Sequence, residues 1–169
     1  MALLLIAYAF VSNVALAVVP HEPVVIWYGP RLGVWTTALL ATLGTVAAAW
    51  VDHRVFVPVM ARVATRPILV AGPLGRLARL FTRAPFAIIA VSGVTPLPSF
   101  PFKALAFAAR YPLWRYLTAV AAGRLPRYLL LAWLGVVISV PAWVFVLLFL
   151  PFVIPSLIRM IPWNKNGAK

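Results

Sequence analysis

The chain contains no cysteine and very few acidic residues, and both shortages restrict its chemistry. Its 169 residues include two carboxylates, Glu22 and Asp52, and two histidines, His21 and His53. Without cysteine there is no disulfide framework, no thiolate nucleophile and no thiolate metal site. A catalytic carboxylate pair, a Ser-His-Asp triad or a carboxylate metal centre would need nearly all four of these residues. We therefore expect a protein that is not an enzyme and that holds no metal or other cofactor.

Charge of either sign is scarce, and what charge there is has one sign. Hydrophobic residues make up 64% of the chain and charged residues 10%, with a mean hydropathy of +1.02. Soluble domains are about half apolar and a quarter charged, so this composition predicts an all-α polytopic membrane protein. The 15 basic residues give a formal net charge of +13. Because they are spread along an apolar chain, anionic lipid is the expected partner, and nucleic acid is not.

Two uncharged stretches open the chain. Residues 1–20 are long enough for a helix close to bilayer length. A signal peptide is the alternative, since residues 15–17 resemble a cleavage site, but the basic segment that should precede it is absent. We expect the stretch to be retained. Residues 32–51 form the best single transmembrane helix, which we expect to end at the cytoplasmic surface with residues 52–54.

A basic segment follows at residues 54–83. Arg76, Arg79 and Arg83 have the spacing of one helix face, with apolar residues between them. This pattern predicts an amphipathic helix lying in the headgroup layer. A solvated loop that only sets the topology is the alternative. Both interpretations place the segment in the cytoplasm.

Prolines interrupt the next apolar stretch, residues 84–111. Pro96, Pro98 and Pro101 cannot all lie inside a regular helix, because each lacks a donor and clashes with the preceding turn. We expect one short helix over Pro85–Gly93, a re-entrant turn at the prolines, and a second short helix over Pro101–Arg110. Irregular backbone at membrane depth needs surrounding protein or a water-filled cavity.

The two halves of the chain share a pattern. Arg31, Trp35 and Gly44 have the same spacing as Arg110, Trp114 and Gly123, and each set begins next to a proline-broken short segment. This predicts an inverted repeat of a re-entrant hairpin plus a transmembrane helix, as transporters use. We expect one transmembrane domain over residues 1–169. Its parts are a first repeat at 1–53, a cytoplasmic linker at 54–83, a second repeat at 84–138 and a last transmembrane helix at 141–163.

The basic loops also predict an orientation. If both termini are cytoplasmic, the stretch 1–20 crosses outward, the helix after Arg31 returns, and the hairpin 84–111 enters and leaves from the cytoplasm. Every basic loop and the basic tail then face the cytoplasm, and only Arg31 lies near the outer surface, as the positive-inside rule requires.

Residues 92–135 resemble the second half of the DedA family, also called the VTT or SNARE-associated Golgi protein family. The matching features are the Pro-rich turn, Phe102-Lys103, and an aromatic helix with Gly123-Arg124 and Arg127, which is most similar to the short YqaA-type branch. Glu22 lies where the family has an acidic residue in its first re-entrant loop. The resemblance implies movement of undecaprenyl phosphate or phospholipid across a bilayer, coupling to protons or sodium, and a bacterial inner membrane.

Two arginines are the strongest candidates for a site. A helix starting at Pro112 places Arg124 and Arg127 about 18–23 Å along its axis, near mid-membrane, where a charged side chain must face the protein interior or a polar cavity. Their spacing puts them on one helix face. They could bind backbone carbonyls freed by the prolines, or they could clamp a phosphate. Lys103 and Arg110 complete the predicted substrate-binding residues.

The acidic and imidazole groups have weaker patterns. Glu22 is the predicted ion-coupling residue if the two hairpins face one another, and otherwise an ordinary interfacial acid. His21 and His53 are expected at the membrane interface. Taken together, the sequence predicts a translocase or scramblase for an anionic lipid headgroup. An ion-coupled small-solute transporter and a membrane-organising factor acting through residues 62–83 are the alternatives.

Overall fold

The computed structural model describes residues 1–14, 21–63, 81–95 and 100–138, and residues 1–138 form one compact unit. Several sequence predictions lie outside the described residues. These are the turn prolines Pro96 and Pro98, most of the basic segment 54–83, the last helix 141–163 and the basic tail.

Six helices account for nearly all of the described chain, and none of the described residues is in a strand. In the first half, α1 (Ala2–Asn13) and α2 (Glu22–Leu32) are short and α3 (Val34–Val63) is long. In the second half, α5 (Pro85–Val94) and α6 (Phe100–Ala108) are short and α7 (Leu113–Val137) is long. The expected all-helical class is therefore confirmed for this part of the chain.

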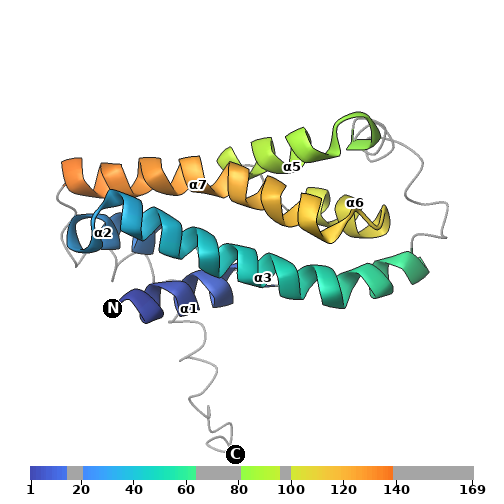
Figure 1. Ribbon diagram of the computed structural model, residues 1–169, viewed down its shortest axis with the longest axis horizontal. Coiled ribbons are helices and arrows are strands. Elements are labelled where there is room, and N and C mark those ends of the chain that lie inside the picture. Colours follow the sequence, from blue (N-terminus) through green and yellow to red (C-terminus); the bar gives the residue numbers. More distant parts are fainter. Residues whose placement is uncertain (15–20, 64–80, 96–99, 139–169) are drawn as a thin grey trace, which may run out of the picture. The chain divides into compact units, whose positions relative to one another are not determined.

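The two long helices form the centre of the bundle (Figure 1). They run antiparallel, because the Thr45 hydroxyl on α3 is bonded to Tyr128 on α7 while His53 lies beside Tyr111 and Tyr116. Segments of both, Val34–Met60 and Leu113–Val137, are long and apolar enough to cross a membrane. Among the residues described, α1 and α5 are apolar but shorter.

Helix α3 does not end at residues 52–54, contrary to the sequence prediction, but continues to Val63. The charged group that was expected to stop it has partners inside the bundle. Asp52 pairs with Lys103, and the His53 Nε2 atom lies 2.7 Å from the backbone oxygen of Tyr111. With their polar atoms satisfied, these residues can lie along a helix instead of at its end.

Helix α1 is shorter than the sequence predicted. Its 12 residues span about 18 Å, against about 30 Å of hydrocarbon in a bilayer. At its end the side chains of Ser12 and Asn13 both donate to the Ala9 carbonyl oxygen, and such side-chain bonds compete with helix propagation. Its N-terminus lies at the end of the bundle where α3 begins (Figure 1). The expected full crossing by residues 1–20 is therefore not seen in the described part of that stretch.

Helices α5 and α6 agree with the expected short helices to within two residues. Pro85 and Pro101 lie in the first turns of these helices, where the missing N–H has no intrahelical acceptor in any case. Helix α6 ends before the chain turns at Arg110, which has a positive φ of 49°. The matching turn between α2 and α3 is made by Gly33, with a φ of 83°.

Glycines let the short helices lie against the long ones. A Cβ on Gly44 would come within 2.8 Å of the Ala9 Cβ and would press on the backbone of α1. A Cβ on Gly123 would collide with the backbone carbonyl of Ala90 on α5. The two glycines that matched in the sequence therefore have the same role, since each receives the first short helix of its own half.

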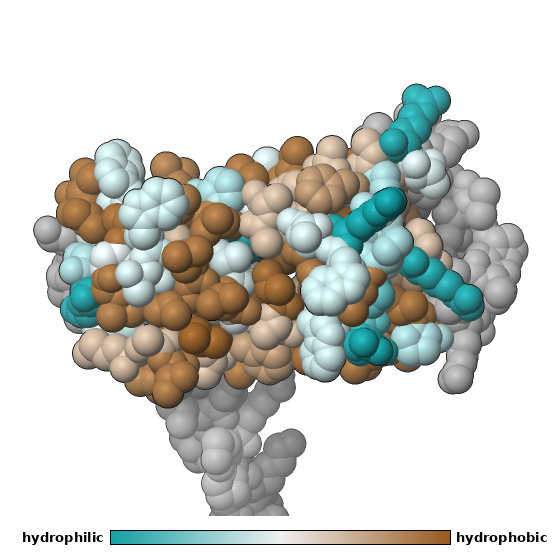
Figure 2. Space-filling view, in the orientation of Figure 1, coloured by the Kyte–Doolittle hydropathy of each residue, from teal (hydrophilic) through white to brown (hydrophobic). Residues whose placement is uncertain are grey.

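The surface of the described bundle is largely apolar, with most of its exposed basic residues toward one end. Figure 2 shows apolar residues over much of one face, most of the strongly hydrophilic residues toward the end where α7 begins, and a smaller hydrophilic spot at the opposite end. Exposed tryptophans lie near both ends of α7, at Trp114 and Trp133, and near the start and the middle of α3, at Trp35 and Trp50. Along the helix axes these pairs are about 28 Å and about 22 Å apart.

Replacing Gly123 by alanine tests the close contact between α5 and α7. The added Cβ has to displace the α5 backbone, so we expect a loss of about 1–3 kcal/mol in stability, measured by thermal unfolding of the detergent-solubilised protein. Ala122→Val adds bulk at the exposed neighbouring position and should leave the unfolding midpoint nearly unchanged. Equal midpoints for G123A and the parent would contradict the packing described.

Candidate functional site

The four short helices all have one end in the middle of the bundle, between α3 and α7. Helix α1 ends at Asn13 and α2 begins beside His21, while α5 ends at Val94 and α6 begins at Phe100. Helix ends leave backbone groups without intrahelical partners. Buried helix ends of this kind need other polar groups, and the bundle supplies them from the long helices and from α6.

The first of these groups is Lys103 on α6. Its ammonium lies 2.8 Å from the Asp52 carboxylate on α3 and donates to the Asn13 backbone oxygen at 3.0 Å. Asp52 is 1% exposed. A buried carboxylate is strongly disfavoured unless it is paired, so this contact fixes α6 against α3 and against the end of α1.

Arg127 on α7 makes the corresponding contacts with the other hairpin ends. It donates to the Glu22 carboxylate at 2.8 Å and to the Thr95 backbone oxygen, just beyond α5, at 2.8 Å. The carboxylate lies in the first turn of α2 and the carbonyl at the end of α5, and both positions suit the helix dipoles. Of the two alternatives for this arginine, the structure has it on a backbone carbonyl as well as on Glu22.

Arg124 differs from both. It is 8% exposed, yet its guanidinium makes no hydrogen bond or ion pair with another described residue. It points into a cavity of about 30 Å³, enough for about two water molecules. The cavity is lined from both halves of the chain, by Asn13, Thr45, Ala49, Ile89, Ser92, Gly93, Phe102, Lys103, Tyr116, Val120 and Arg124.

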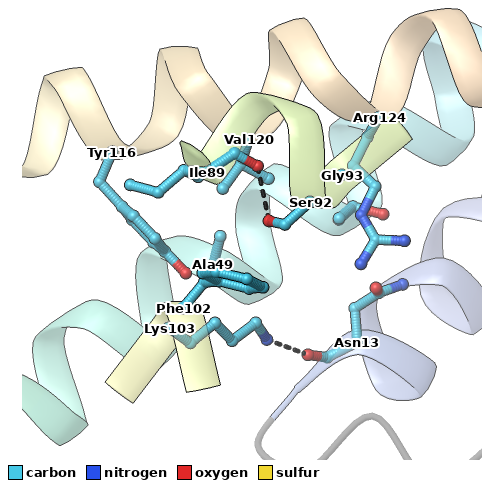
Figure 3. Close-up of a pocket in the computed structure, with 11 residues that line it drawn as sticks. Asn13, Ala49, Ile89, Ser92, Gly93, Phe102, Lys103, Tyr116, Val120 and Arg124 are labelled. Carbon is cyan, nitrogen blue, oxygen red and sulfur yellow. Dashed lines mark hydrogen bonds between the residues drawn. The ribbon is translucent and has the colours of Figure 1, made fainter. Parts of the chain in front are cut away.

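A second polar group in the cavity, the Tyr116 hydroxyl, is likewise without a hydrogen-bond partner in the described part of the chain. It is fully buried. Leaving a buried hydroxyl unpaired costs about 1–3 kcal/mol. Figure 3 shows Tyr116 entering the cavity from one side and Arg124 from the other, with Asn13 between Arg124 and Lys103.

The charges about the cavity do not balance. Lys103, Arg124 and Arg127 carry three positive charges, and Asp52 and Glu22 carry two negative ones. The unpaired charge is that of Arg124. An isolated buried cation is costly, so the cavity favours an anion, which could also accept a hydrogen bond from Tyr116.

A hydrogen-bonded row of side chains leads away from the cavity wall. Thr45 lies 2.8 Å from the Tyr128 hydroxyl, which lies 2.7 Å from His21 Nε2. His21 is 5% exposed and its ring is satisfied inside the bundle by Tyr128, a burial that the expected position at the membrane interface did not include. His21 Nδ1 faces the Glu22 carboxylate at 3.9 Å.

His21 and Glu22 lie outside the two candidate membrane spans, and their environment shifts the pKa of each side chain. Burial lowers the pKa of His21 to about 4; the Glu22 charge opposes this, while Arg124 and Arg127 add to it. Burial alone would raise the pKa of Glu22, but His21, a backbone hydrogen bond and the two arginines together lower it. At neutral pH the imidazole is therefore uncharged and the carboxylate ionised.

The structure brings together Glu22, Lys103, Arg124 and Arg127 from the predicted set, and Pro101 lies in the first turn of the helix that carries Lys103. Arg110 does not join them, because it is exposed at the α6–α7 turn. Sequence reasoning missed Asn13, Tyr116 and the pairing of Asp52. The scarcity of acids was a usable signal for Asp52, since a chain with two acids and fifteen bases has a base available to pair with each acid that lies in an apolar segment. No pattern marked Tyr116.

Comparison of the chain with protein-family models, with curated proteins and with solved structures gives no match.

A double-mutant cycle tests the Asp52–Lys103 pair. Asp52→Asn leaves Lys103 without its counter-charge, so we expect a loss of about 3 kcal/mol in unfolding free energy in detergent. Lys103→Met added to D52N should recover part of that loss, because no unpaired charge remains. Arg115→Gln, at an exposed position on α7, should change stability little. A double variant less stable than D52N would contradict a pairing of these two charges.

Proposed function

We propose that the protein is a membrane translocase that lets an anionic lipid headgroup pass between leaflets, using the cavity at Arg124. The observation that carries the proposal is the buried guanidinium of Arg124, which lines the cavity between the two halves and has no ion pair among the described residues. The Tyr116 hydroxyl, which has no hydrogen-bond partner among the same residues, enters the cavity from the other side. A guanidinium binds phosphate through a planar fork of donors.

Membrane insertion is supported by the surface of the bundle. Two helices have the length and apolarity of spans, and the exposed tryptophans of α7, about 28 Å apart along its axis, are separated by nearly the thickness of the hydrocarbon layer. Arg54, Arg83, Arg110 and Arg115 are exposed, and they lie near the end of the bundle where α3 finishes and α7 starts. By the positive-inside rule this end is cytoplasmic. The N-terminus, at the opposite end, is then on the outer side, which revises the orientation expected from the sequence.

The arrangement of the halves also supports a transport role. Helices α1 and α2 enter and leave from one end of the bundle, and α5 and α6 from the other (Figure 1). Gly44 and Gly123 make equivalent contacts in the two halves. An inverted repeat of re-entrant hairpins, with a site where they meet, accounts for these features. The resemblance of residues 92–135 to the DedA family agrees with this interpretation.

The size of the cavity constrains the mechanism. A space of about 30 Å³ is too small for a phosphate headgroup, so passage requires the halves to separate. The ion pairs Glu22–Arg127 and Asp52–Lys103 both join one half to the other. An entering phosphate can replace a carboxylate as the partner of Arg127 or Lys103, so opening would exchange ion pairs without leaving charges bare.

Arg124→Gln tests the proposed headgroup site. In liposomes, the parent should speed the redistribution of a fluorescent anionic lipid, followed by dithionite quenching of the outer leaflet. R124Q should slow this by at least about tenfold, the effect of about 1.4 kcal/mol in binding the headgroup. Its stability should be equal or higher, because an unpaired buried charge is removed. Arg115→Gln on the same helix is the control and should retain full activity.

Tyr116→Phe gives an independent test. The hydroxyl has no partner in the described structure, so its removal should not lower the unfolding midpoint but should slow lipid movement. No acceleration by the parent for any anionic lipid, or full activity of R124Q, would refute the proposal.

A small-anion transporter is a second candidate, favoured by the small volume of the cavity. Anion efflux from liposomes that depends on Arg124 and occurs without lipid redistribution would identify it. Lipid redistribution without such efflux would identify the translocase.

Cysteine labelling tests the orientation, because the chain has no cysteine of its own. Ala2→Cys and Ala109→Cys introduce thiols at exposed positions at opposite ends of the bundle. In right-side-out vesicles an impermeant maleimide should label A2C and leave A109C unlabelled until the membrane is permeabilised. Labelling of both from the same side would mean that the stretch 1–20 crosses the membrane.

A further inference from the structure

The row from Thr45 through Tyr128 to His21 attaches the start of α2 to α7 and α3, and it also connects two distinct environments. Thr45 lines the cavity. At the other end, Glu22 is partly exposed, its side chain at 31%. Tyr128 and His21 between them are buried. The imidazole of His21, a titratable group, therefore lies between the cavity at Arg124 and the carboxylate of Glu22, which is partly exposed to solvent.

Hydrogen bonding indicates where a proton can be added. Thr45 donates to the Ala41 backbone oxygen at 2.9 Å, so its oxygen can accept from Tyr128. When Tyr128 donates to Thr45, the Tyr128 oxygen accepts from His21 Nε2–H, and in this tautomer the lone pair of Nδ1 faces Glu22. A proton from solvent that adds to Nδ1 makes an imidazolium beside a carboxylate, without breaking any bond in the row.

The charges around His21 decide whether that proton binds. Glu22 beside it favours the imidazolium, while Arg124 and Arg127 on α7 oppose it. The other titratable groups nearby are Tyr128 on α7 and Tyr8 on α1, which responds to the Glu22 charge. His21 also precedes the first turn of α2, where the helix dipole disfavours a cation. An anion that neutralises Arg124 removes the repulsion between the Arg124 charge and a protonated His21.

We propose that His21 is the proton-binding group of the anion site: an anion that binds at Arg124 raises the proton affinity of His21 Nδ1, so that in the pH range where His21 titrates the site takes up protons from solvent as the anion binds and releases them as it departs. The proposal rests on the anion site of the proposed function. Proton and anion binding then strengthen each other by the same factor, because the coupling of two sites is reciprocal. The imidazolium also competes with Arg127 for Glu22, which loosens one of the two ion pairs between the halves.

The experiment uses octyl sulfate below its micelle concentration as the probe, because its charge does not change between pH 4 and 8. The chain has two histidines, and His53→Gln leaves His21 as the only imidazole. NMR titration of H53Q should show the pKa of His21 rising by about one unit on saturation with octyl sulfate, which corresponds to a coupling of about tenfold. In the parent, affinity for octyl sulfate should rise several-fold as the pH falls from 7 to 4.

Two variants locate the proton. His21→Gln should bind octyl sulfate with an affinity that no longer changes with pH, while H53Q keeps the dependence. If Glu22→Gln abolishes the dependence and H21Q does not, Glu22 is the proton-binding group and the proposal is overturned. A His21 pKa that does not move on saturation overturns it as well.

The two levels of the argument fail in different ways. Binding that requires Arg124 but takes up no proton at His21 refutes only the role of His21. If the parent does not bind octyl sulfate, or if Arg124→Gln binds it equally well, the anion site itself is wrong, and the role of His21 falls with it. The Arg124→Gln variant without octyl sulfate provides a test that does not depend on a ligand. Removing the Arg124 charge should raise the pKa of His21 in an NMR titration of this variant.

Discussion

The arrangement of the bundle depends on the pairing of scarce acids with plentiful bases inside an apolar protein. Glu22 and Asp52 are the only carboxylates in the chain, and each is bound to a base from the other half. Both bases also hold a backbone carbonyl at the end of a short helix. Each of the two cations therefore neutralises a carboxylate and also donates to a carbonyl oxygen that the end of a helix leaves without an intrahelical partner. With both acids occupied in this way, Arg124 has no acid left to pair with.

Local patterns in the sequence were sufficient for some of this structure. The prolines indicated α5 and α6 because their effect on a helix is short-range and steric. The glycine match also held, since a close helix contact requires a missing side chain at one position. Of the four predicted site residues that the structure brings together, Arg124 and Arg127 were predicted because charge within an apolar helix is rare enough to be informative.

Features that depend on distant partners could not be predicted in the same way. The continuation of α3 past Asp52 requires Lys103, which lies 51 residues further along the chain. The end of α1 depends on the side chains of Ser12 and Asn13, which donate hydrogen bonds to the Ala9 carbonyl oxygen. The composition of this uncharged stretch does not predict where such bonds form. His21 looked interfacial because its partner Tyr128 is 107 residues away. In each case the missing information was the identity of a tertiary contact.

The distribution of interior charge also makes the two halves distinguishable. Both acids come from the first half and both paired bases from the second, so the interface is heteropolar although the order of helices is repeated. Two first halves placed face to face would bring carboxylates together, and two second halves would bring cations together. Like charges at close range disfavour such assemblies. If the two halves are expressed as separate polypeptides, they should therefore assemble only as the mixed pair. Electrostatic complementarity is sufficient to exclude pairs of identical halves.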